Sequence, residues 1–301
     1  MKNNMLIPKG KLISIGGNED KGANEEPDYI QRNNLNFTNL QILSKFKQEL
    51  HKENPRVEVI TSASKIPYEI GEIYLSAFSK LGCTNVESMH IKSLEDAKNP
   101  EFIERIKVAD GVLFTGGNQV RLSAFFNDSE FLTILKQRYY HETGFVIAGT
   151  SAGAMAMSNI MIYSGSSSEA LLKGEVKISN GLNFIDKVII DTHFVTRGRI
   201  GRLAQAVATY PDSIGVGLAD DTGVLITDGN KLEAIGSGLV IIVDGFEMMH
   251  TNLSEIRDGS PLSIENLIVH VMAKGNHYDL NLRKFYAKKL GPAAAEKKKE
   301  F

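Results

Sequence analysis

Short apolar runs alternate with amphipathic stretches through the first half of the chain. An apolar run that stops at glycine or at a polar loop, as in 11–15, predicts a buried strand. A stretch with apolar residues every three or four positions, as in 38–52, predicts a helix. Strand and helix units in succession are typical of an open, largely parallel sheet with helices on both faces. We expect strands at 11–15, 56–60, 86–91, 111–114 and from 145 onward, and helices at 38–52, 68–81, 100–108, 119–126 and 129–140.

Beyond residue 210 the pattern changes to short strands separated by turn sequences such as Asp228-Gly229 and Asp244-Gly245. This pattern predicts an antiparallel C-terminal extension of the same sheet-based domain. No linker-like run and no internal repeat interrupts the chain, so we expect one domain over 1–290 and a solvated tail over 291–301. The strands predicted for the extension are 213–219, 222–227, 231–235, 238–243, 267–272 and 279–282.

Composition narrows the possible functions. With 42% hydrophobic residues, 23% charged residues and a net charge of -2, the chain lacks the basic excess of a general nucleic-acid binder. Its single cysteine, Cys83, excludes an internal disulfide framework and is better explained as a small buried residue than as a nucleophile. No apolar run approaches the roughly 20 residues of a membrane span. No apolar segment of a signal peptide follows the first lysines, which predicts a cytoplasmic protein, although an exported protein cut from a longer precursor would look the same.

The stretch from Phe145 to Ala154 carries the first sign of catalysis. It predicts a strand that ends at Gly149, a sharp turn through Ser151 and a helix that begins near Gly153. Gly-x-Ser-x-Gly is the sequence of a nucleophile elbow, in which glycines permit the tight turn and the helix N-terminus favours a developing oxyanion. The alternative is an ordinary strand-to-helix loop that happens to contain serine and glycine.

A candidate base and a candidate third acid follow the elbow. In an open parallel sheet the site lies at the carboxyl ends of the strands, and the loops 16–19, 61–64, 115–119 and 150–153 meet there. His193 ends another apolar strand two residues after Asp191, and a later strand ends in Asp220-Asp221. A carboxylate at either of those two positions could hold the imidazole in the tautomer that a Ser–His pair needs.

Three arginines follow the histidine within six residues: Arg197, Arg199 and Arg202. Arginine binds a carboxylate through two parallel hydrogen bonds, so the cluster indicates an anionic ligand. The alternative is a solvated basic start of a helix. Cations at a helix N-terminus oppose the helix dipole, which favours a ligand or an ion-pair partner.

The order Ser151, His193, acid differs from the Ser, acid, His order of α/β-hydrolases and from the orders of trypsin-like and subtilisin-like enzymes. The chain instead resembles the cyanophycinases, a group of serine peptidases of family S51 that share a fold with class I glutamine amidotransferases. The resemblance rests on motifs in family order across most of 11–227. They are Gly16-Gly-Asn-Glu-Asp-Lys21, Phe114-Thr-Gly-Gly-Asn-Gln119, Gly149-Thr-Ser-Ala-Gly-Ala154, Asp191-x-His-Phe-x-x-Arg-x-Arg-x-x-Arg-Leu203 and Gly215-x-Gly-x-x-Asp-Asp-Thr222.

The resemblance implies a flavodoxin-like fold and a serine exopeptidase that cleaves cyanophycin, a poly-aspartate with arginine on each β-carboxyl, into β-aspartyl-arginine dipeptides. It also implies a homodimer. From the residues themselves we expect no metal and no cofactor, because no metal-ligand spacing and no dinucleotide fingerprint is visible. By position the resemblance implies Ser151 as nucleophile, His193 as base, Asp220 as third acid, the amides of Gly117 and Ala152 as oxyanion hole, and Gln119, Asp191, Thr192, Arg197, Arg199 and Arg202 as substrate-binding residues.

The sequence departs from the family at two of these positions. Asp220 stands where the family usually has glutamate, and Asp221 beside it could compete for the histidine. Thr192 stands where many members have glutamine. Two other functions stay open at this point: an aspartyl or isoaspartyl dipeptidase of the same family, and a binding protein that has lost turnover through the shorter acid.

Overall fold

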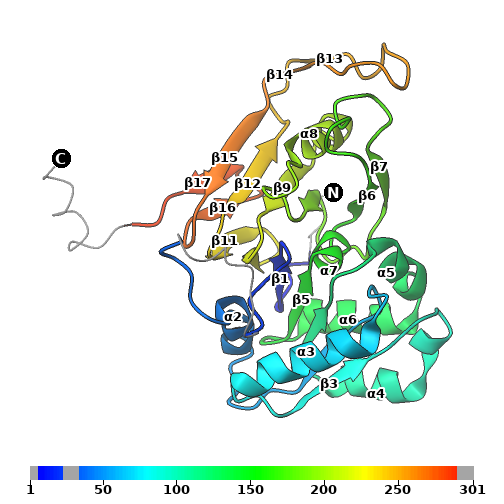
Figure 1. Ribbon diagram of the computed structural model, residues 1–301, viewed down its shortest axis with the longest axis vertical. Coiled ribbons are helices and arrows are strands. Elements are labelled where there is room, and N and C mark those ends of the chain that lie inside the picture. The colour runs from blue at the N-terminus through cyan, green and yellow to red at the C-terminus, as the bar shows by residue number, and fades with distance from the viewer. Residues whose placement is uncertain (1–5, 23–33, 290–301) are drawn as a thin grey trace, which may run out of the picture.

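A nine-stranded mixed sheet crosses the centre of the computed structural model, which describes residues 6–22 and 34–289 (Figure 1). Five neighbouring strands of this sheet run parallel to one another. Several of them are buried along their whole length, as expected for strands covered on both faces. In spatial order they are β1 (Lys11–Ile15), β5 (Val146–Thr150), β4 (Gly111–Phe114), β2 (Val57–Ile60) and β3 (Val86–Met89).

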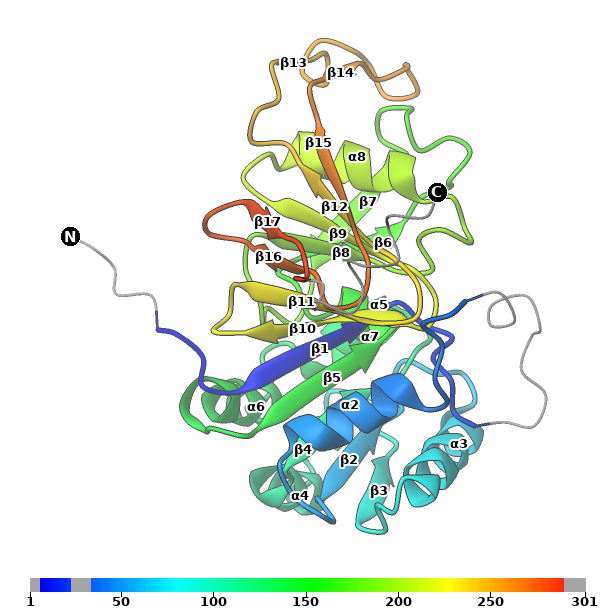
Figure 2. The same ribbon diagram turned by 90° about the vertical axis from the view of Figure 1, so that its left-hand side faces the viewer.

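Helices cover both faces of the parallel strands (Figure 2). Successive side chains of β1 point to opposite faces of the sheet, and each face is packed against different helices. Ile13 and Ile15 join one cluster with α2 (Gln41–Glu49) and α3 (Pro67–Lys80). Leu12 joins the other cluster, to which the helices of the opposite face contribute: α4 (Pro100–Val108), α5 (Gln119–Phe126) and α6 (Glu130–His141). The short 3-10 helix η1 (Asp96–Lys98) precedes α4. The predicted α/β class is confirmed.

The predicted antiparallel extension of the first sheet is confirmed, but only two of its four strands, at 222–227 and 231–236, match predicted strands. β10 pairs antiparallel with β1, and three further strands continue the sheet outward from it. They are β10 (Thr222–Thr227), β11 (Lys231–Gly236), β16 (His277–Asp279) and β17 (Lys284–Tyr286).

The remaining C-terminal strands form a separate four-stranded sheet, which the sequence analysis did not distinguish from the first (Figure 2). β8 (Val188–Asp191) and β9 (Ile214–Leu218) pair in parallel, and β12 (Val240–Asp244) and β15 (Ile268–Met272) continue antiparallel. Helix α8 (Ile200–Thr209) packs on this sheet. Two hairpins were not predicted: β6 (Ile160–Ser164) with β7 (Lys177–Asn180), and β13 (His250–Thr251) with β14 (Ile264–Glu265).

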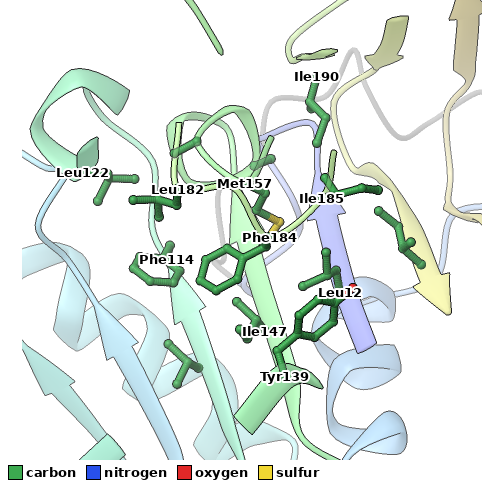
Figure 3. Close-up of a cluster of buried hydrophobic side chains, with 14 of the residues drawn as sticks. Leu12, Phe114, Leu122, Tyr139, Ile147, Met157, Leu182, Phe184, Ile185 and Ile190 are labelled. Carbon is green, nitrogen blue, oxygen red and sulfur yellow. The ribbon is translucent and has the colours of Figure 1, made fainter. Parts of the chain in front are cut away.

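One hydrophobic cluster connects the two sheets. It contains residues of the parallel strands, such as Leu12 and Ile147, and of the second sheet, such as Ile190 and Val216. Figure 3 shows its centre, where Leu182 and Phe184 reach from the segment before β8 toward Phe114. This continuity fits the expected single domain over 1–290, which stays a prediction, and the expected tail lies outside the described residues. Within 6–22 and 34–289, no helix combines the length and apolarity that a membrane crossing needs.

The register brings the carboxyl ends of the parallel strands to one edge of the sheet. Ile15 lies opposite Thr150, and Phe114 lies opposite both Gly149 and Ile60. The four loops expected at one rim therefore do follow neighbouring strand ends. The second sheet reaches the same rim, because the segment after β8 bonds to the loop after β1.

Replacing Leu182 with alanine tests the shared core. Leu182 is completely buried, so Leu182→Ala is expected to lower the free energy of unfolding by about 2–5 kcal/mol through lost burial and a residual cavity. Leu282 is 66% exposed, and Leu282→Ala is expected to change stability by no more than about 0.5 kcal/mol. Urea denaturation of the two variants measures both values. Equal losses would contradict a core that includes the segment before β8.

Candidate active site

The elbow forms as the sequence predicts. Ser151 lies between the end of β5 and the start of the short helix α7 (Ala152–Met155), with φ 50° and ψ −110°. A positive φ is uncommon for a residue with a side chain and marks a strained turn of the kind found at functional sites. A Cβ on Gly149 would lie 2.5 Å from the carbonyl carbon of Gly153, and one on Gly153 would lie 2.3 Å from the carbonyl oxygen of Phe114. Both glycines are therefore required for the close approach of strand and helix.

The serine, the histidine and one aspartate form a continuous hydrogen-bonded chain. Ser151 Oγ lies 2.9 Å from His193 Nε2, and His193 Nδ1 lies 2.5 Å from Asp220 Oδ1. His193 and Asp220 are each 6% exposed, so bulk water competes little for these bonds. When the imidazole donates its Nδ1–H to the aspartate, its Nε2 lone pair is available for the serine hydroxyl proton. This arrangement is suited to nucleophilic catalysis.

The two neighbouring aspartates have different partners. Asp221 accepts hydrogen bonds from Gln41 Nε2 at 3.0 Å and Ser237 Oγ at 2.7 Å, and burial raises its pKa. For Asp220, burial alone would raise the pKa, but hydrogen bonds from His193 and Thr196 outweigh it and lower the pKa. The ionised carboxylate that faces the imidazole is therefore that of Asp220.

Thr196 was missed by the sequence analysis. Its Oγ1 donates to Asp220 Oδ2 at 2.8 Å, so the aspartate oxygen that does not face His193 is also held. The only hint in the sequence was a hydroxyl residue one helical turn after the histidine. The side chain of Asn18 adds a further hydrogen bond to Asp220. Together these donors fix an acid that is one methylene shorter than the glutamate usual in the resembled family.

The end of β1 joins the three segments that carry these residues. Gly17, with φ 103°, lies against the imidazole, and a Cβ there would come within 2.3 Å of His193 Cε1. A Cβ on Gly16 would meet the carbonyl oxygen of Ala219 at 2.0 Å. Three consecutive backbone carbonyls at this point accept hydrogen bonds: Ile15 from Ser151 N at 2.9 Å, Gly16 from His193 N at 2.8 Å and Gly17 from Asp221 N at 2.9 Å.

The expected oxyanion amides belong to two segments near the serine. Ala152 is the first residue of α7, where backbone amides have no partner within the helix. The loop after β4 also approaches the serine, since a Cβ on Gly116 would be 3.4 Å from Ser151 Cβ. Gly117 follows with φ 141°, and a Cβ there would lie 2.1 Å from the carbonyl oxygen of Ala63, so glycine is required.

The arginine cluster is organised by a buried acid. Asp191 is completely buried and accepts two hydrogen bonds from Arg202, each 2.5 Å long. Arg199 Nη1 donates to Asp191 Oδ1 at 3.2 Å and to the carbonyl oxygen of Thr192 at 2.7 Å. Burial lowers the pKa of Arg199 to about 10, with Asp191 opposing and the other arginines adding to the shift, so this guanidinium stays charged at neutral pH. The predicted ion-pair partner is thus Asp191, within the chain itself.

The other expected substrate residues differ in accessibility. Arg197 is exposed at the start of the segment. Thr192 is completely buried, and its hydroxyl has no hydrogen-bond partner among the described residues. Gln119, the first residue of α5, is half-buried and donates to the carbonyl oxygen of Ile162 at 2.9 Å. Asp191 and Thr192 are therefore too buried to contact a ligand directly. They act on it only through Arg199 and Arg202, which they bind.

A second buried acid borders the serine. Glu19 accepts hydrogen bonds from Tyr74 OH and, at 2.6 Å, from Thr150 Oγ1, and Lys21 Nζ lies 3.3 Å from it. Burial alone would raise the pKa of Glu19, but Lys21 and the two hydroxyl donors outweigh it and lower the pKa. The Glu19 carboxylate is therefore ionised, and groups of the protein already bind it.

The candidate nucleophile and base open onto a cleft of about 190 Å³, called the serine cleft below. The loop after β1 and part of α3 also line it. Within the part of the chain that the structure describes, no group of three or more His, Cys, Asp or Glu side chains could hold a metal ion. The residues lining the serine cleft are Gly17, Asn18, Glu19, Lys21, Ile70, Tyr74, Gly116, Thr150, Ser151 and His193.

Comparison with known proteins assigns the chain to a family. The model of peptidase family S51 matches residues 33–234, more than half of the chain. The chain belongs to peptidase family S51. Among its relatives, a cyanophycinase of Trichormus variabilis is 34% identical over 275 residues, which cover 91% of this chain and 87% of the relative. A cyanophycinase of Synechococcus elongatus is 33% identical over 272 residues, which cover 90% of this chain and 80% of the relative.

A solved structure supports the fold of this S51 chain. The crystal structure of a peptidase from an acI-B1 Actinobacterium has a TM-score of 0.58 and 20% identity to it, covering 80% of this chain and 93% of that chain. Family membership makes the protein a serine peptidase and confirms the resemblance drawn from the motifs.

Gly17→Ala tests the contact between the end of β1 and the imidazole. A methyl group at this position displaces the ring from Ser151, and we expect the rate of serine labelling by a neutral phosphonate to fall roughly 100-fold. Gly144, with φ 87° and nothing within 4 Å of its added Cβ, provides the control. Gly144→Ala carries similar backbone strain but should label at the normal rate. Equal labelling of the two variants would contradict the proposed contact.

Thr196→Val tests the second hydrogen bond to Asp220. Valine keeps the shape of threonine but removes the hydroxyl donor, and we expect labelling to slow roughly 10-fold because the carboxylate is less firmly held. Thr196→Ser keeps the donor and should retain most of the rate. If valine and serine variants label equally fast, the hydroxyl contributes nothing to the site.

Proposed function

We propose that this S51 peptidase is a cyanophycinase that hydrolyses cyanophycin to β-aspartyl-arginine dipeptides through an acyl-enzyme. The observation that carries the proposal is the chain Ser151–His193–Asp220, with spacings of 2.9 and 2.5 Å, in a protein about one-third identical to several cyanophycinases over nine-tenths of its length. The intact geometry also favours an enzyme over a binding homologue, because the shorter acid still reaches the imidazole.

The first half of the proposed reaction forms the acyl-enzyme. Ser151 Oγ attacks the carbonyl carbon of the scissile amide while His193 Nε2 takes the hydroxyl proton. The amides of Gly117 and Ala152 stabilise the oxyanion. His193 then protonates the leaving nitrogen, the C–N bond breaks, and the amine product departs. Asp220 stays ionised and stabilises the imidazolium in both protonation steps.

The second half restores the enzyme. A water molecule takes the place of the departed amine, and His193 Nε2 removes one of its protons as the oxygen attacks the ester carbonyl. The C–O bond to Ser151 breaks, and the serine oxygen takes the proton back from His193. The free acid is released, so each cycle consumes one water and breaks one amide bond.

The charges at the rim support a substrate of this kind. Each dipeptide unit of cyanophycin presents a free carboxylate and a guanidinium. Arg197 is exposed and Arg199 half-buried beside the histidine segment, and both suit carboxylates. Asp191 is proposed to hold Arg199 and Arg202 in place rather than to contact substrate, because it is fully buried between them.

Incubation with purified cyanophycin, followed by mass analysis, tests the proposal. We expect β-aspartyl-arginine to accumulate with the natural protein and the rate to fall roughly 10⁴-fold or more in Ser151→Ala. Short aspartyl and isoaspartyl dipeptides are offered in parallel. If cyanophycin stays intact while the short dipeptides are cleaved rapidly, the protein is a dipeptidase and not a cyanophycinase. If a phosphonate does not label Ser151, the proposed serine mechanism is wrong.

A further inference from the structure

The chain passes from the second sheet to the first through a short connection that contains the third acid. Only residues 219–221 separate the end of β9, in the second sheet, from the start of β10, in the first. Within this connection Asp220 faces His193. The mechanism above gives no role to its neighbour Asp221.

The carboxylate of Asp221 accepts hydrogen bonds at both of its oxygens, and the residue is 1% exposed. Oδ1 accepts from the backbone amide of Asp20 at 3.2 Å. Oδ2 accepts from Gln41 Nε2 at 3.0 Å and from Ser237 Oγ at 2.7 Å. These donors belong to the loop after β1, to the first residue of α2 and to the turn after β11. One buried side chain therefore connects three segments beside the first sheet.

The backbone of Asp221 is held as firmly as its side chain. Its amide donates to the carbonyl oxygen of Gly17 at 2.9 Å, and its carbonyl oxygen accepts from Ser237 N at 2.8 Å. Its φ of 46° lies in the left-handed region, which aspartate enters more readily than most residues with a side chain. A Cβ on Gly236 would lie 2.3 Å from the carbonyl oxygen of Asp221, so glycine is required beside it. These contacts fix the direction in which the chain leaves Asp220.

The amide group of Gln41 is oriented from its other end. Lys274 Nζ donates to Gln41 Oε1 at 3.0 Å, so the amide nitrogen is the atom that faces Asp221. Oδ1 of Asp221 also faces a donor, the backbone amide of Asp20. A carboxylate can accept on both sides, whereas the carboxamide of asparagine would turn its own donor toward one of these groups.

We propose that Asp221 is a positioning residue, which fixes the connection between the two sheets and thereby holds Asp220 at hydrogen-bond distance from His193. The inference rests on the proposed function, in which Asp220 orients the imidazole and stabilises its charged form. Because the side chain of Asp220 is short, a small shift of its backbone would lengthen the 2.5 Å contact with the ring. Thr196 holds the carboxylate of Asp220, and Asp221 holds the backbone that carries it.

Asp221→Asn tests this role through the rate at which a neutral phosphonate labels Ser151. We expect the rate to fall roughly 10- to 100-fold, because Asp220 and the imidazole are no longer held in the reactive arrangement. Asp220→Asn should cost roughly 10⁴-fold, the loss that follows when the third acid of a triad becomes an amide. If Asp221→Asn causes the larger loss, Asp221 is itself the third acid and the inference is wrong.

Gln41→Met removes one donor to Asp221 and leaves every charged residue in place. We expect labelling to slow roughly 3- to 10-fold. The pH at which labelling reaches half its maximum should also fall, because a less firmly held Asp220 stabilises the imidazolium of His193 less. A loss of folded protein alone would lower the labelled amount at every pH and leave this midpoint unchanged.

Gln48→Met provides the matched control. It makes the same substitution in the same helix, α2, at an exposed residue whose side chain bonds only to Ser44, at 3.4 Å, among the described residues. We expect the natural labelling rate and the natural midpoint.

Three further results would overturn the inference in distinguishable ways. Natural rates and midpoints in both Asp221→Asn and Gln41→Met remove the positioning role while the proposed function stands. Slow labelling of Gln41→Met with an unchanged midpoint shows that Asp221 supports only the fold. No labelling of Ser151 in the natural protein removes the proposed serine mechanism and this inference together.

Discussion

The end of β1 is the constraint on which the candidate site depends. The nucleophile belongs to the first sheet, whereas the histidine and the third acid follow strands of the second sheet. Three consecutive carbonyls at the end of β1 bind the backbones of all three segments. A shift of this strand end would move the serine and the imidazole relative to each other, so the 2.9 Å contact between them requires the two sheets to be fixed at this point. The glycines at 16 and 17 allow the second sheet to approach so closely.

The buried ion pairs secure the other side of the site. Asp191, Arg199 and Arg202 connect the end of β8 with the start of α8, and the segment between them contains His193. Removing one partner of such a buried pair leaves an uncompensated charge and typically costs about 3–5 kcal/mol. The arginines therefore also position the histidine segment. This structural role explains how cations are tolerated at the N-terminus of α8, where the helix dipole opposes them.

Sequence patterns were sufficient for most of the fold and for part of the site. Periodicity located the parallel strands and their helices to within a few residues, because most of these strands are buried on both faces and the helices on one. The separate second sheet could not be predicted, because the apolar runs of β8 and β9 look like those of the central strands. The local sequence of a strand does not show which other strand it pairs with. The roles of Glu19 and Thr196 were missed for the same reason. Their partners, Thr150 and Asp220, are distant in sequence, and only the folded chain brings them together.

Burial decides the sign of the charge that a substrate meets at this rim. Two acids of the candidate site, Glu19 and Asp191, lie inside the protein, and cations paired with them are more exposed to solvent than the acids are. Each acid thereby fixes a cation at lower entropic cost than a flexible surface side chain would require, and protein hydrogen bonds screen its own charge. Although the whole chain carries a net charge of -2, its candidate site presents positive groups to a ligand. A net charge close to zero therefore argues against general affinity for polyanions, but it is compatible with local binding of carboxylates. A polymer of aspartate and arginine presents a carboxylate in every repeating unit.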